Sequence, residues 1–409
     1  MVGAGIVGLS AAWFLQESNV QVTVLDRGDV GAGSSCGNAG WIAPGLVSPL
    51  PEPAALKYGL RAALSPRGPV YAPALPSLRF LSFMRSFIAN STVARWRAGM
   101  AALVPFAGHA LSAYEALLSG GVDADVCEAR PLLACYRSAS QRGPLLEELL
   151  AARRFGAAVD FEPITGDQAR QLEPMLADAV TAGIRVEGQR YLNPPAFVAA
   201  LSRSVQKRGG AIRTGTPVTE CRSSGSGAVV TTSAGDMTCD AVLLAAGAWL
   251  SDLARHAGVR QQVQAGRGYS FAVPVSRPTG IPLYFPAARL ACLPLPGGYL
   301  RVAGVMEFQK PDGRLHARRV EAMTRSARGF LTGLDVGRRQ DVWVGARPCT
   351  ADGLPLIGRT RSPHVFVAGG HGMWGVTLGP ATGRLAAELI VSGSAPAELA
   401  AFDPLRGPR

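Results

Sequence analysis

The 409-residue sequence has almost no lysine and no paired cysteines. Only 3 of its 41 basic residues are lysine, so arginine carries nearly all of the positive charge behind the formal net charge of +12. The 7 cysteines form no C-x-x-C pair and no metal-ligand spacing, which excludes the common zinc motifs and favours reduced thiols. The stretch 314–325, with four arginines and one histidine, comes nearest to a basic stripe, but it lacks the interleaved aromatic residues of a nucleic-acid-binding site. We therefore expect neither a metal site nor a nucleic-acid partner.

Long apolar runs are also missing. The stretch 241–250 (AVLLAAGAWL) falls well short of the ~20 residues that cross a bilayer, and it is typical of a buried parallel strand and turn. No signal-peptide pattern opens the sequence. These absences predict a cytoplasmic protein. The positive charge favours attraction of anionic substrates or, as the alternative, peripheral contact with the inner face of the membrane.

What the sequence does have is a glycine loop at its start, which reads G-A-G-I-V-G at residues 3–8. A helix at 9–16 and a strand at 21–25 are expected to follow, with an acid at the end of that strand. In such a unit the glycines permit a tight turn, close approach of backbone to a pyrophosphate and close helix packing, while the acid accepts hydrogen bonds from a ribose diol. This order predicts a dinucleotide site rather than a ligand-free turn. The residues concerned are Gly3, Gly5, Ile6, Val7, Gly8, Asp26 and Arg27.

Three later stretches indicate that the dinucleotide is a flavin. They are the small-residue loop at 31–40, the strand and turn at 240–250, and the glycine-rich pair 342–357 and 368–383. Glycines let backbone lie against a flat ring, and a helix start beside that ring places positive charge where a reduced flavin is negative. The further cofactor contacts predicted are Gly33, Ser34, Ser35, Asn38, Ala39, Gly40, Val218, Ala246, Gly247, Trp249, Gly345, Gly370, Gly372, Met373, Trp374, Gly375, Val376 and Thr377.

The length suggests two domains, and the pattern along the chain suggests that one is interrupted. A βαβ start gives way to inserted material and returns later, which predicts an α/β fold with a discontinuous Rossmann-like FAD-binding domain. We assign residues 1–46, 195–265 and 340–409 to this domain. Residues 47–194 and 266–339 are expected to form a mixed α+β substrate domain with an antiparallel sheet between 269 and 305. Helices are predicted at 311–331 and 380–391, and a short strand at 342–345.

Several stretches resemble the D-amino-acid-oxidase-type FAD-dependent oxidoreductases, and among them the bacterial D-amino acid dehydrogenases. They are the N-terminal loop, SSCGNAG with WIAP at 34–44, GRGYSF at 266–271, GARPCTADGLPLIG at 345–358 and GHGMWGVTLGPATG at 370–383. The resemblance implies hydride transfer from substrate Cα to flavin N5. The imine is then hydrolysed to an oxo acid and ammonia, and the electrons pass to a quinone-type acceptor. Oxidases or dehydrogenases of glycine, sarcosine or (hydroxy)proline share this scaffold and are the alternative.

The resemblance also implies roles for particular residues. Arg347 matches the family arginine that holds the substrate carboxylate, which a guanidinium can bind bidentately. Tyr284 and Tyr269 are candidates to donate to that carboxylate or to close the pocket, with core packing as the alternative for Tyr269. His371 is expected to contact flavin or substrate rather than to transfer protons. Some relatives attach FAD through a cysteine near this stretch, but the matching position is Gly345, so we predict non-covalent FAD.

Two parts of the sequence leave open questions. Residues 44–107 are punctuated by proline and contain two basic amphipathic pieces, 56–64 and 78–88, which are either helices packed on the core or a surface for a membrane or electron acceptor. Ahead of the glycine loop stand only Met1 and Val2, where family members have about five more apolar residues to complete a strand. We hypothesise that translation begins upstream or that the chain was trimmed.

Overall fold

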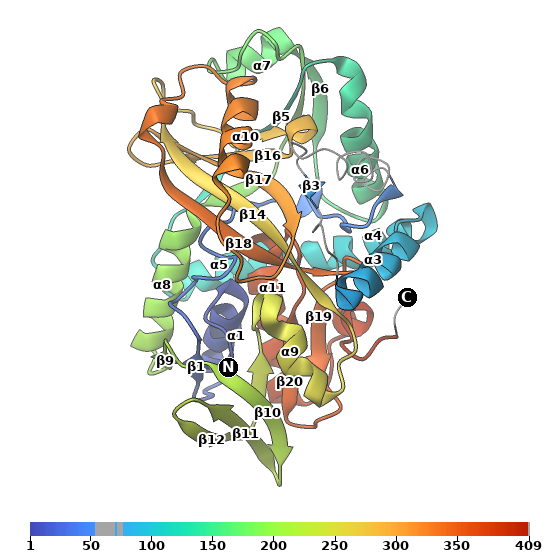
Figure 1. Ribbon diagram of the computed structural model, residues 1–409, viewed down its shortest axis with the longest axis vertical. Coiled ribbons are helices and arrows are strands. Elements are labelled where there is room, and N and C mark those ends of the chain that lie inside the picture. Colours follow the sequence, from blue (N-terminus) through green and yellow to red (C-terminus); the bar gives the residue numbers. More distant parts are fainter. Residues whose placement is uncertain (54–69, 72–76, 408–409) are drawn as a thin grey trace.

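A computed structural model describes residues 1–53, 70–71 and 77–407 (Figure 1). In this view the lower part holds the N-terminus and a small, largely parallel sheet, and the upper part holds a larger mixed sheet that is mostly antiparallel. The α/β class predicted from the sequence is confirmed. The basic amphipathic piece noted at 56–64 lies outside the described residues.

The lower sheet is centred on Val2. This residue forms parallel bridges with Leu25 and Leu244, so Met1–Gly3 acts as the central strand between β1 and β13. β9 continues the sheet beside β1, β20 pairs with β13, and β19 forms an antiparallel edge. The strands are Thr23–Leu25 (β1), Ala211–Arg213 (β9), Val242–Leu244 (β13), Leu356–Arg359 (β19) and Val365–Gly369 (β20).

Helices pack against this sheet to form one of the apolar cores. Helices α1 and α11 lie side by side, and Trp13 of α1 is buried with residues of α5, α8 and α11. A three-stranded antiparallel sheet and the short helix α9 form a second core with Val2 and Leu244. The elements are α1 (Ile6–Glu17), α5 (Ala110–Ser119), α8 (Pro194–Lys207), α9 (Leu250–Ala254), α11 (Gly375–Ser392), β10 (Val218–Ser224), β11 (Gly227–Thr232) and β12 (Gly235–Cys239).

The large sheet has the order β18-β14-β17-β16-β15-β5-β7-β6, with β3 paired to β17. The antiparallel strands predicted between 269 and 305 are confirmed within it. One face packs on helix α10 through Phe271, Val320 and Met323. The strands are β3 (Val70–Tyr71), β5 (Leu132–Tyr136), β6 (Phe161–Thr165), β7 (Ala182–Val186), β14 (Val263–Pro274), β15 (Leu283–Phe285), β16 (Leu290–Leu295), β17 (Tyr299–Phe308) and β18 (Gln340–Thr350).

The remaining elements surround this sheet and join the two parts. Helix α6 packs against β5 and β7 through Leu145 and Leu149. The amphipathic piece predicted at 78–88 forms α3, where the Ser77 hydroxyl accepts from Phe80 N–H as an N-cap. These elements are α3 (Leu78–Asn90), α4 (Val93–Ala107), α6 (Gly143–Arg154), α7 (Gly166–Leu172), α10 (Ala317–Arg328), β2 (Trp41–Ile42), β4 (Val126–Glu128) and β8 (Arg190–Leu192).

Three elements differ from the sequence prediction. The helix expected at 311–331 begins only at Ala317, because residues 311–316 form a loop and a turn that reach the lower part of the molecule. The short strand expected at 342–345 is the middle of the 11-residue β18, which pairs along β14 across the expected domain boundary at residue 340. The helix α4 was not predicted, because its sequence is rich in alanine and has no clear periodicity.

The closing helix, expected at 380–391, begins five residues earlier at Gly375 and therefore contains Pro380. Proline has no N–H, so the carbonyl four residues before it, that of Val376, loses its helical donor. The Tyr114 hydroxyl of α5 donates to the Val376 carbonyl at 2.6 Å and replaces that bond. A side chain from another helix thus lets α11 start early, next to the glycines at 370–375.

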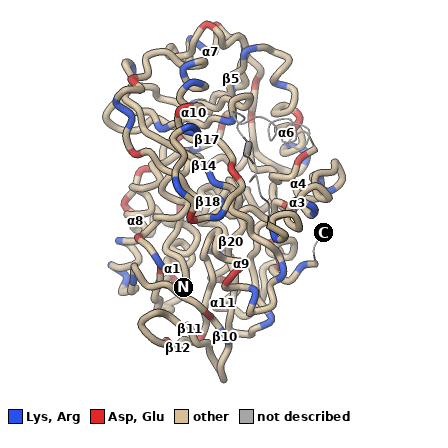
Figure 2. Tube along the Cα trace, in the orientation of Figure 1, with Lys and Arg blue, Asp and Glu red and all other residues tan. Residues whose placement is uncertain are grey.

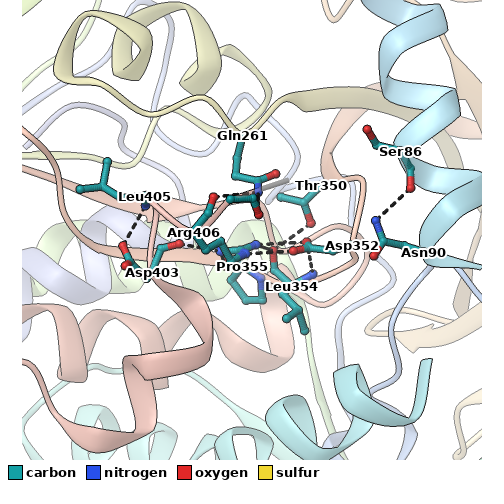
Figure 3. Close-up of polar contacts among 11 residues, drawn as sticks. Ser86, Asn90, Gln261, Thr350, Asp352, Leu354, Pro355, Asp403, Leu405 and Arg406 are labelled. Atoms are coloured by element: carbon teal, nitrogen blue, oxygen red, sulfur yellow. Dashed lines mark hydrogen bonds and ion pairs between the residues drawn. The ribbon is translucent and has the colours of Figure 1, made fainter. Parts of the chain in front are cut away.

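A buried ion pair fixes the loop that follows β18 (Figure 3). Arg406, near the C-terminus, contacts both oxygens of Asp352 at 2.9 and 3.1 Å, and both side chains are nearly inaccessible to solvent. The guanidinium also donates to the carbonyls of Leu354 and Pro355, while Asp352 accepts from Leu354 N–H. Every donor direction of the arginine on this side is used, so the end of β18 is held rigidly.

The distribution of charge and apolar surface bears on partners. Figure 2 shows lysine and arginine spread over both parts of the molecule and interleaved with acids. Residues Val93–Ser119 have the length and hydropathy of a membrane span, with 44% of that window buried. In the fold this stretch is divided into α4 and α5, whose residues Leu103, Phe106 and Leu117 belong to the core around α1.

Candidate active site

A cavity of about 990 Å³ lies between the two parts and extends from the glycine loop to the large sheet. Its size is typical of sites that enclose a cofactor or a large ligand. It brings together most of the site residues predicted from the sequence. They are Gly3, Gly5, Ile6, Val7, Asp26, Arg27, Gly33, Ser34, Ser35, Asn38, Ala39, Val218, Ala246, Gly247, Trp249, Tyr284, Arg347, His371, Gly372, Met373, Trp374, Gly375, Val376 and Thr377.

The glycine loop has the geometry that its sequence requires. Gly3 has φ +113°, and a Cβ there would lie 2.4 Å from the Ala245 carbonyl oxygen. A Cβ on Gly8 would lie 2.0 Å from the Gly3 carbonyl oxygen, so this glycine lets α1 pack against the strand, although it does not line the cavity. The first turn of α1 therefore presents the positive end of the helix dipole to the cavity.

Two side chains shape this loop from neighbouring segments. Asp26 accepts from Ala4 N–H at 2.7 Å and from Gly28 N–H at 2.8 Å, which fixes its carboxylate at the cavity edge. Each carboxylate oxygen has a second lone pair for another donor. Ser35 accepts from Ile6 N–H at 3.0 Å, so the small-residue loop is bound to the start of α1.

The outer end of this half of the cavity is closed by a contact between the two parts. Asp312, from the loop before α10, forms an ion pair with Arg27 at 2.7 Å and accepts from Trp249 Nε1 at 3.1 Å. The Arg27 guanidinium lies 4.5 Å above the Trp249 ring. Arg27 and Trp249 are predicted cofactor contacts, whereas nothing in the sequence indicated that Asp312 would join them.

Arg347 lies on the wall of the other half of the cavity, on β18. Its Nη1 donates to the Val305 carbonyl at 2.6 Å, and its guanidinium packs over Gly268, where a Cβ would lie 2.3 Å from Cζ. Burial lowers the pKa of Arg347 from its ordinary value, yet an arginine stays charged. A charged guanidinium on a cavity wall is suited to binding a carboxylate.

The carbonyl that orients Arg347 comes from a strained residue. Val305 has φ +62°, in the left-handed region that a β-branched side chain rarely adopts. Such a conformation costs on the order of 1–3 kcal/mol and is often found where a site requires it. Here it turns a strand carbonyl toward the arginine. No pattern in the sequence indicated this residue.

His371 and Trp374 connect the start of α11 to the rest of the site. Burial lowers the pKa of His371 to about 4, and its Nε2 lies 2.8 Å from the Thr382 hydroxyl, so the ring is neutral near pH 7. Trp374 Nε1 donates to the Ser48 carbonyl at 2.8 Å. Thr377 is held by Trp41, whose carbonyl accepts from the threonine hydroxyl at 3.0 Å. These bonds position residues 371–377 along the cavity.

The substrate-facing wall includes charged residues that sequence reasoning missed. Glu52 and Glu148 both line the cavity, and their charges act on one another, with Arg289 close to both. Burial, and then the charge of Glu52, raises the pKa of Glu148 to about 8. Tyr284 lies beside them, and the Trp41 ring packs on it edge to face at 5.3 Å. The acids come from a proline-rich loop and an ordinary-looking helix, neither of which suggests a site.

Five predicted site residues do not line the cavity. Gly8 and Gly40 serve close packing, since a Cβ on Gly40 would lie 2.2 Å from the Leu192 carbonyl oxygen. Gly345 leaves room for the Trp343 ring, which itself lines the cavity. Gly370 packs against a methyl group of Thr350. Tyr269 is buried away from the cavity and donates to Glu307 at 2.6 Å, which favours the core-packing alternative over a catalytic role.

Comparison with known proteins agrees with this geometry. The family model described as FAD dependent oxidoreductase (DAO) matches residues 1–389. The chain belongs to this family. It is 27% identical to a D-amino acid dehydrogenase of Azorhizobium caulinodans, with 97% of this chain and 96% of the relative covered. A D-amino acid dehydrogenase of Cereibacter sphaeroides is 29% identical, with 97% and 92% covered.

The fold is also found in solved structures. The glycine oxidase of Geobacillus kaustophilus superposes with a TM-score of 0.75 at 24% identity, covering 99% of this chain and 97% of that one. The resemblance predicted from sequence motifs, that of a D-amino-acid-oxidase-type FAD-dependent oxidoreductase, is thus confirmed at the level of the family and the fold.

Proposed function

We propose that this chain oxidises D-amino acids to oxo acids through an imine, with FAD as its redox group and a quinone-type molecule as electron acceptor. The observation that carries the proposal is a continuous cavity with a glycine loop at one end and the buried Arg347 at the other. The full-length similarity to relatives named D-amino acid dehydrogenase supports the choice of substrate class.

The residues present fit FAD. Gly3 and Gly5 line the cavity, Asp26 is fixed at its edge with acceptor capacity to spare, and α1 begins directly after Gly5. The start of α11 brings a second helix dipole to the same cavity through Gly375 and Val376. When bound, FAD supplies the acceptor for the hydride of the substrate.

The side chains of the other half bind and orient the substrate. Arg347 holds the carboxylate, and the Val305 carbonyl keeps one guanidinium nitrogen in place. Tyr284 and Trp41 form a wall, and Tyr284 keeps its proton because burial raises the pKa of its phenol to about 12. His371 is neutral and bonded to Thr382, so it positions the loop rather than transferring a proton.

We also propose that FAD is held without a covalent bond. No cysteine lines the cavity within the described part of the chain. Cys349, the nearest in sequence to Arg347, is buried, and burial raises the pKa of its thiol to about 12, which keeps it protonated. Acid precipitation should release all of the yellow colour, and colour left in the protein pellet would contradict the proposal.

The decisive experiment is anaerobic mixing of the purified protein with matched D- and L-amino acids. Loss of the visible flavin absorbance with D-enantiomers alone would support the proposal, and bleaching by glycine, sarcosine or proline alone would favour the alternative activity. Reoxidation then tests the acceptor. Rapid return of colour with a soluble quinone but slow return with oxygen is expected of a dehydrogenase, and the reverse order would identify an oxidase.

For the location we propose a cytoplasmic protein with peripheral contact to the inner membrane face through α3. Leu78, Leu81 and Ile88 on this helix are 86%, 49% and 46% exposed, beside the exposed Arg85. Exposed apolar residues with arginine suit an anionic lipid surface. Co-sedimentation with anionic vesicles, but not with neutral ones, would support this contact, and its persistence in a Leu78→Ser, Leu81→Ser variant would refute it.

A further inference from the structure

The cluster that the proposed mechanism does not use is the pair of acids on the cavity wall. Glu52 follows the loop after Leu46, and Glu148 projects from the middle of α6. The charge of Glu52 raises the pKa of Glu148, so the two carboxyls act on one another, and Ser48 lines the cavity with them. Because both side chains line the cavity, this pair is available to a ligand and is not a sealed part of the core.

The acids lie in the substrate half of the cavity. Arg289, which is close to both, ends the turn before β16, and its carbonyl oxygen would be 2.5 Å from a Cβ on Gly304. The carbonyl oxygen of the next residue, Val305, accepts a hydrogen bond from the Arg347 guanidinium. Arg289 and Arg347 therefore flank the same stretch of β17. A ligand held by Arg347 at one end has the two acids within the same enclosed space.

This arrangement is costly without a ligand. Two neighbouring carboxyls in a buried site cannot both ionise, so they retain a proton near neutral pH. Tyr284 and Ser48 line the same cavity as the two acids and add polar groups to its wall. Two carboxyls that line a ligand-sized cavity and must share a proton there are suited to a cation that takes the place of that proton.

We propose that Glu52 and Glu148 bind the cationic side chain of the substrate, so that the preferred substrates are D-amino acids that carry a guanidinium or an amine. This inference rests on the proposed function and names its substrate class. The cation takes the place of the shared proton, both carboxylates ionise, and the proton leaves to solvent. With Arg289 and the side-chain cation, two positive charges then face two negative ones, and the site stays neutral. Tyr284 and Ser48, which also line the cavity, supply the remaining polar contacts.

The test compares substrates that differ in charge but hardly in shape. D-arginine and D-citrulline have nearly the same length and planarity, and only D-arginine is cationic. We expect the kcat/KM of D-arginine to exceed that of D-citrulline on the order of 10²-fold, as for other buried charge pairs. In Glu148→Gln and Glu52→Gln the ratio should fall below about tenfold, because the rate with D-arginine drops while that with D-citrulline does not. Glu147→Gln, at the exposed neighbour on the same helix, is the control and should keep the ratio.

A binding measurement keeps the test independent of turnover and of any folding defect in the variants. Calorimetry of the holoenzyme with δ-guanidinovalerate, which has no amine to oxidise, should show release of close to one proton near neutral pH, whereas hexanoate should show none. Equal kcat/KM for D-arginine and D-citrulline, or binding of δ-guanidinovalerate without proton release, would overturn the inference while D-amino acid oxidation itself stood. If no D-amino acid were oxidised, the proposed function would fail, and proton release would still decide whether the acids bind a cation.

Discussion

The half of the cavity that faces the glycine loop is lined mainly by backbone and small side chains, whereas the half that faces the large sheet is lined by charged side chains from several elements. In the first half, Gly3, Gly5 and Ser35 come from two neighbouring segments of the chain. In the second, Glu148 and Arg347 are far apart in sequence and meet only through the fold. A cofactor shared by a whole family requires a constant surface, while a substrate that differs between members requires side chains that can change.

The largest effect is expected from a substitution that disrupts the charged half of the cavity and leaves the backbone half intact. Arg347→Ala should lower kcat/KM for D-amino acids about 10³-fold, because a substrate carboxylate would lose its buried partner. FAD content, measured by absorbance, should stay near one per chain. Arg347→Lys keeps the positive charge but loses the two parallel N–H donors of the guanidinium, so it should recover only part of the lost kcat/KM. Normal turnover by the alanine variant would contradict the role given to this residue.

The buried ion pair between Asp352 and Arg406, which holds the end of β18, can be removed without changing a residue of the cavity wall. Asp352→Ala leaves the Arg406 guanidinium buried without its carboxylate, and we expect the free energy of unfolding to fall by about 3 kcal/mol. Urea denaturation measures this loss. Asp403→Ala is the comparison and should cost much less, because the Asp403 carboxylate accepts from the exposed Leu405 N–H, while the bonds from Arg406 go to the Asp403 backbone carbonyl, which alanine keeps. Equal losses in the two variants would show that the buried ion pair stabilises the fold no more than an exposed hydrogen bond does.

The backbone half is expected to respond to a single methyl group. Gly3→Ala places a Cβ 2.4 Å from the Ala245 carbonyl oxygen at a positive φ, which should destabilise the protein by ~1–3 kcal/mol and reduce bound FAD. Gly143→Ala is the matched control, since a Cβ there meets no atom within 4 Å among the described residues. Retention of full FAD content in Gly3→Ala would argue against the pyrophosphate role of this loop.

The smallest expected effect concerns pH and stability in the charged half. The folded Glu148 carboxyl keeps its proton to about pH 8, while an unfolded glutamate loses it near 4.5. Between these values the folded state binds more protons, so this residue's contribution to the free energy of unfolding falls as pH rises. Denaturation of FAD-free protein across this window should show the decline in wild type and in Glu147→Gln. A decline of the same size in Glu148→Gln would show that another group causes it.

The sequence predicted the backbone half well, because its determinants are local. A tight turn needs glycine at Gly3 whatever the rest of the fold does, and the acid at Asp26 follows a strand that any reader can locate. The charged half was predicted only at Arg347 and Tyr284, where a family motif and an expected strand marked the positions. Glu148 stands next to another glutamate, Glu147, and the sequence does not distinguish the two. The way α6 packs places Glu148 on the cavity wall and leaves Glu147 exposed to solvent.

Two predictions failed or shifted for tertiary reasons. Tyr269 lies on a strand, as predicted, but its side chain does not face the cavity. It bonds to the buried Glu307, because this face of β14 packs toward α10. The start of α11 was placed at Pro380, since proline normally begins a helix, and only the hydroxyl of Tyr114 lets the helix extend past it.

The contact of Asp312 with Arg27 and Trp249 has a consequence for cofactor retention. Both partners of the ion pair are about half exposed, at 50% and 58%, so dissolved salt can reach and weaken it. Because these residues close the outer end of the glycine-loop half, the dissociation of FAD should quicken with ionic strength. A protein kept in dilute buffer would then hold its yellow colour through dialysis, and the same protein in concentrated salt would lose it.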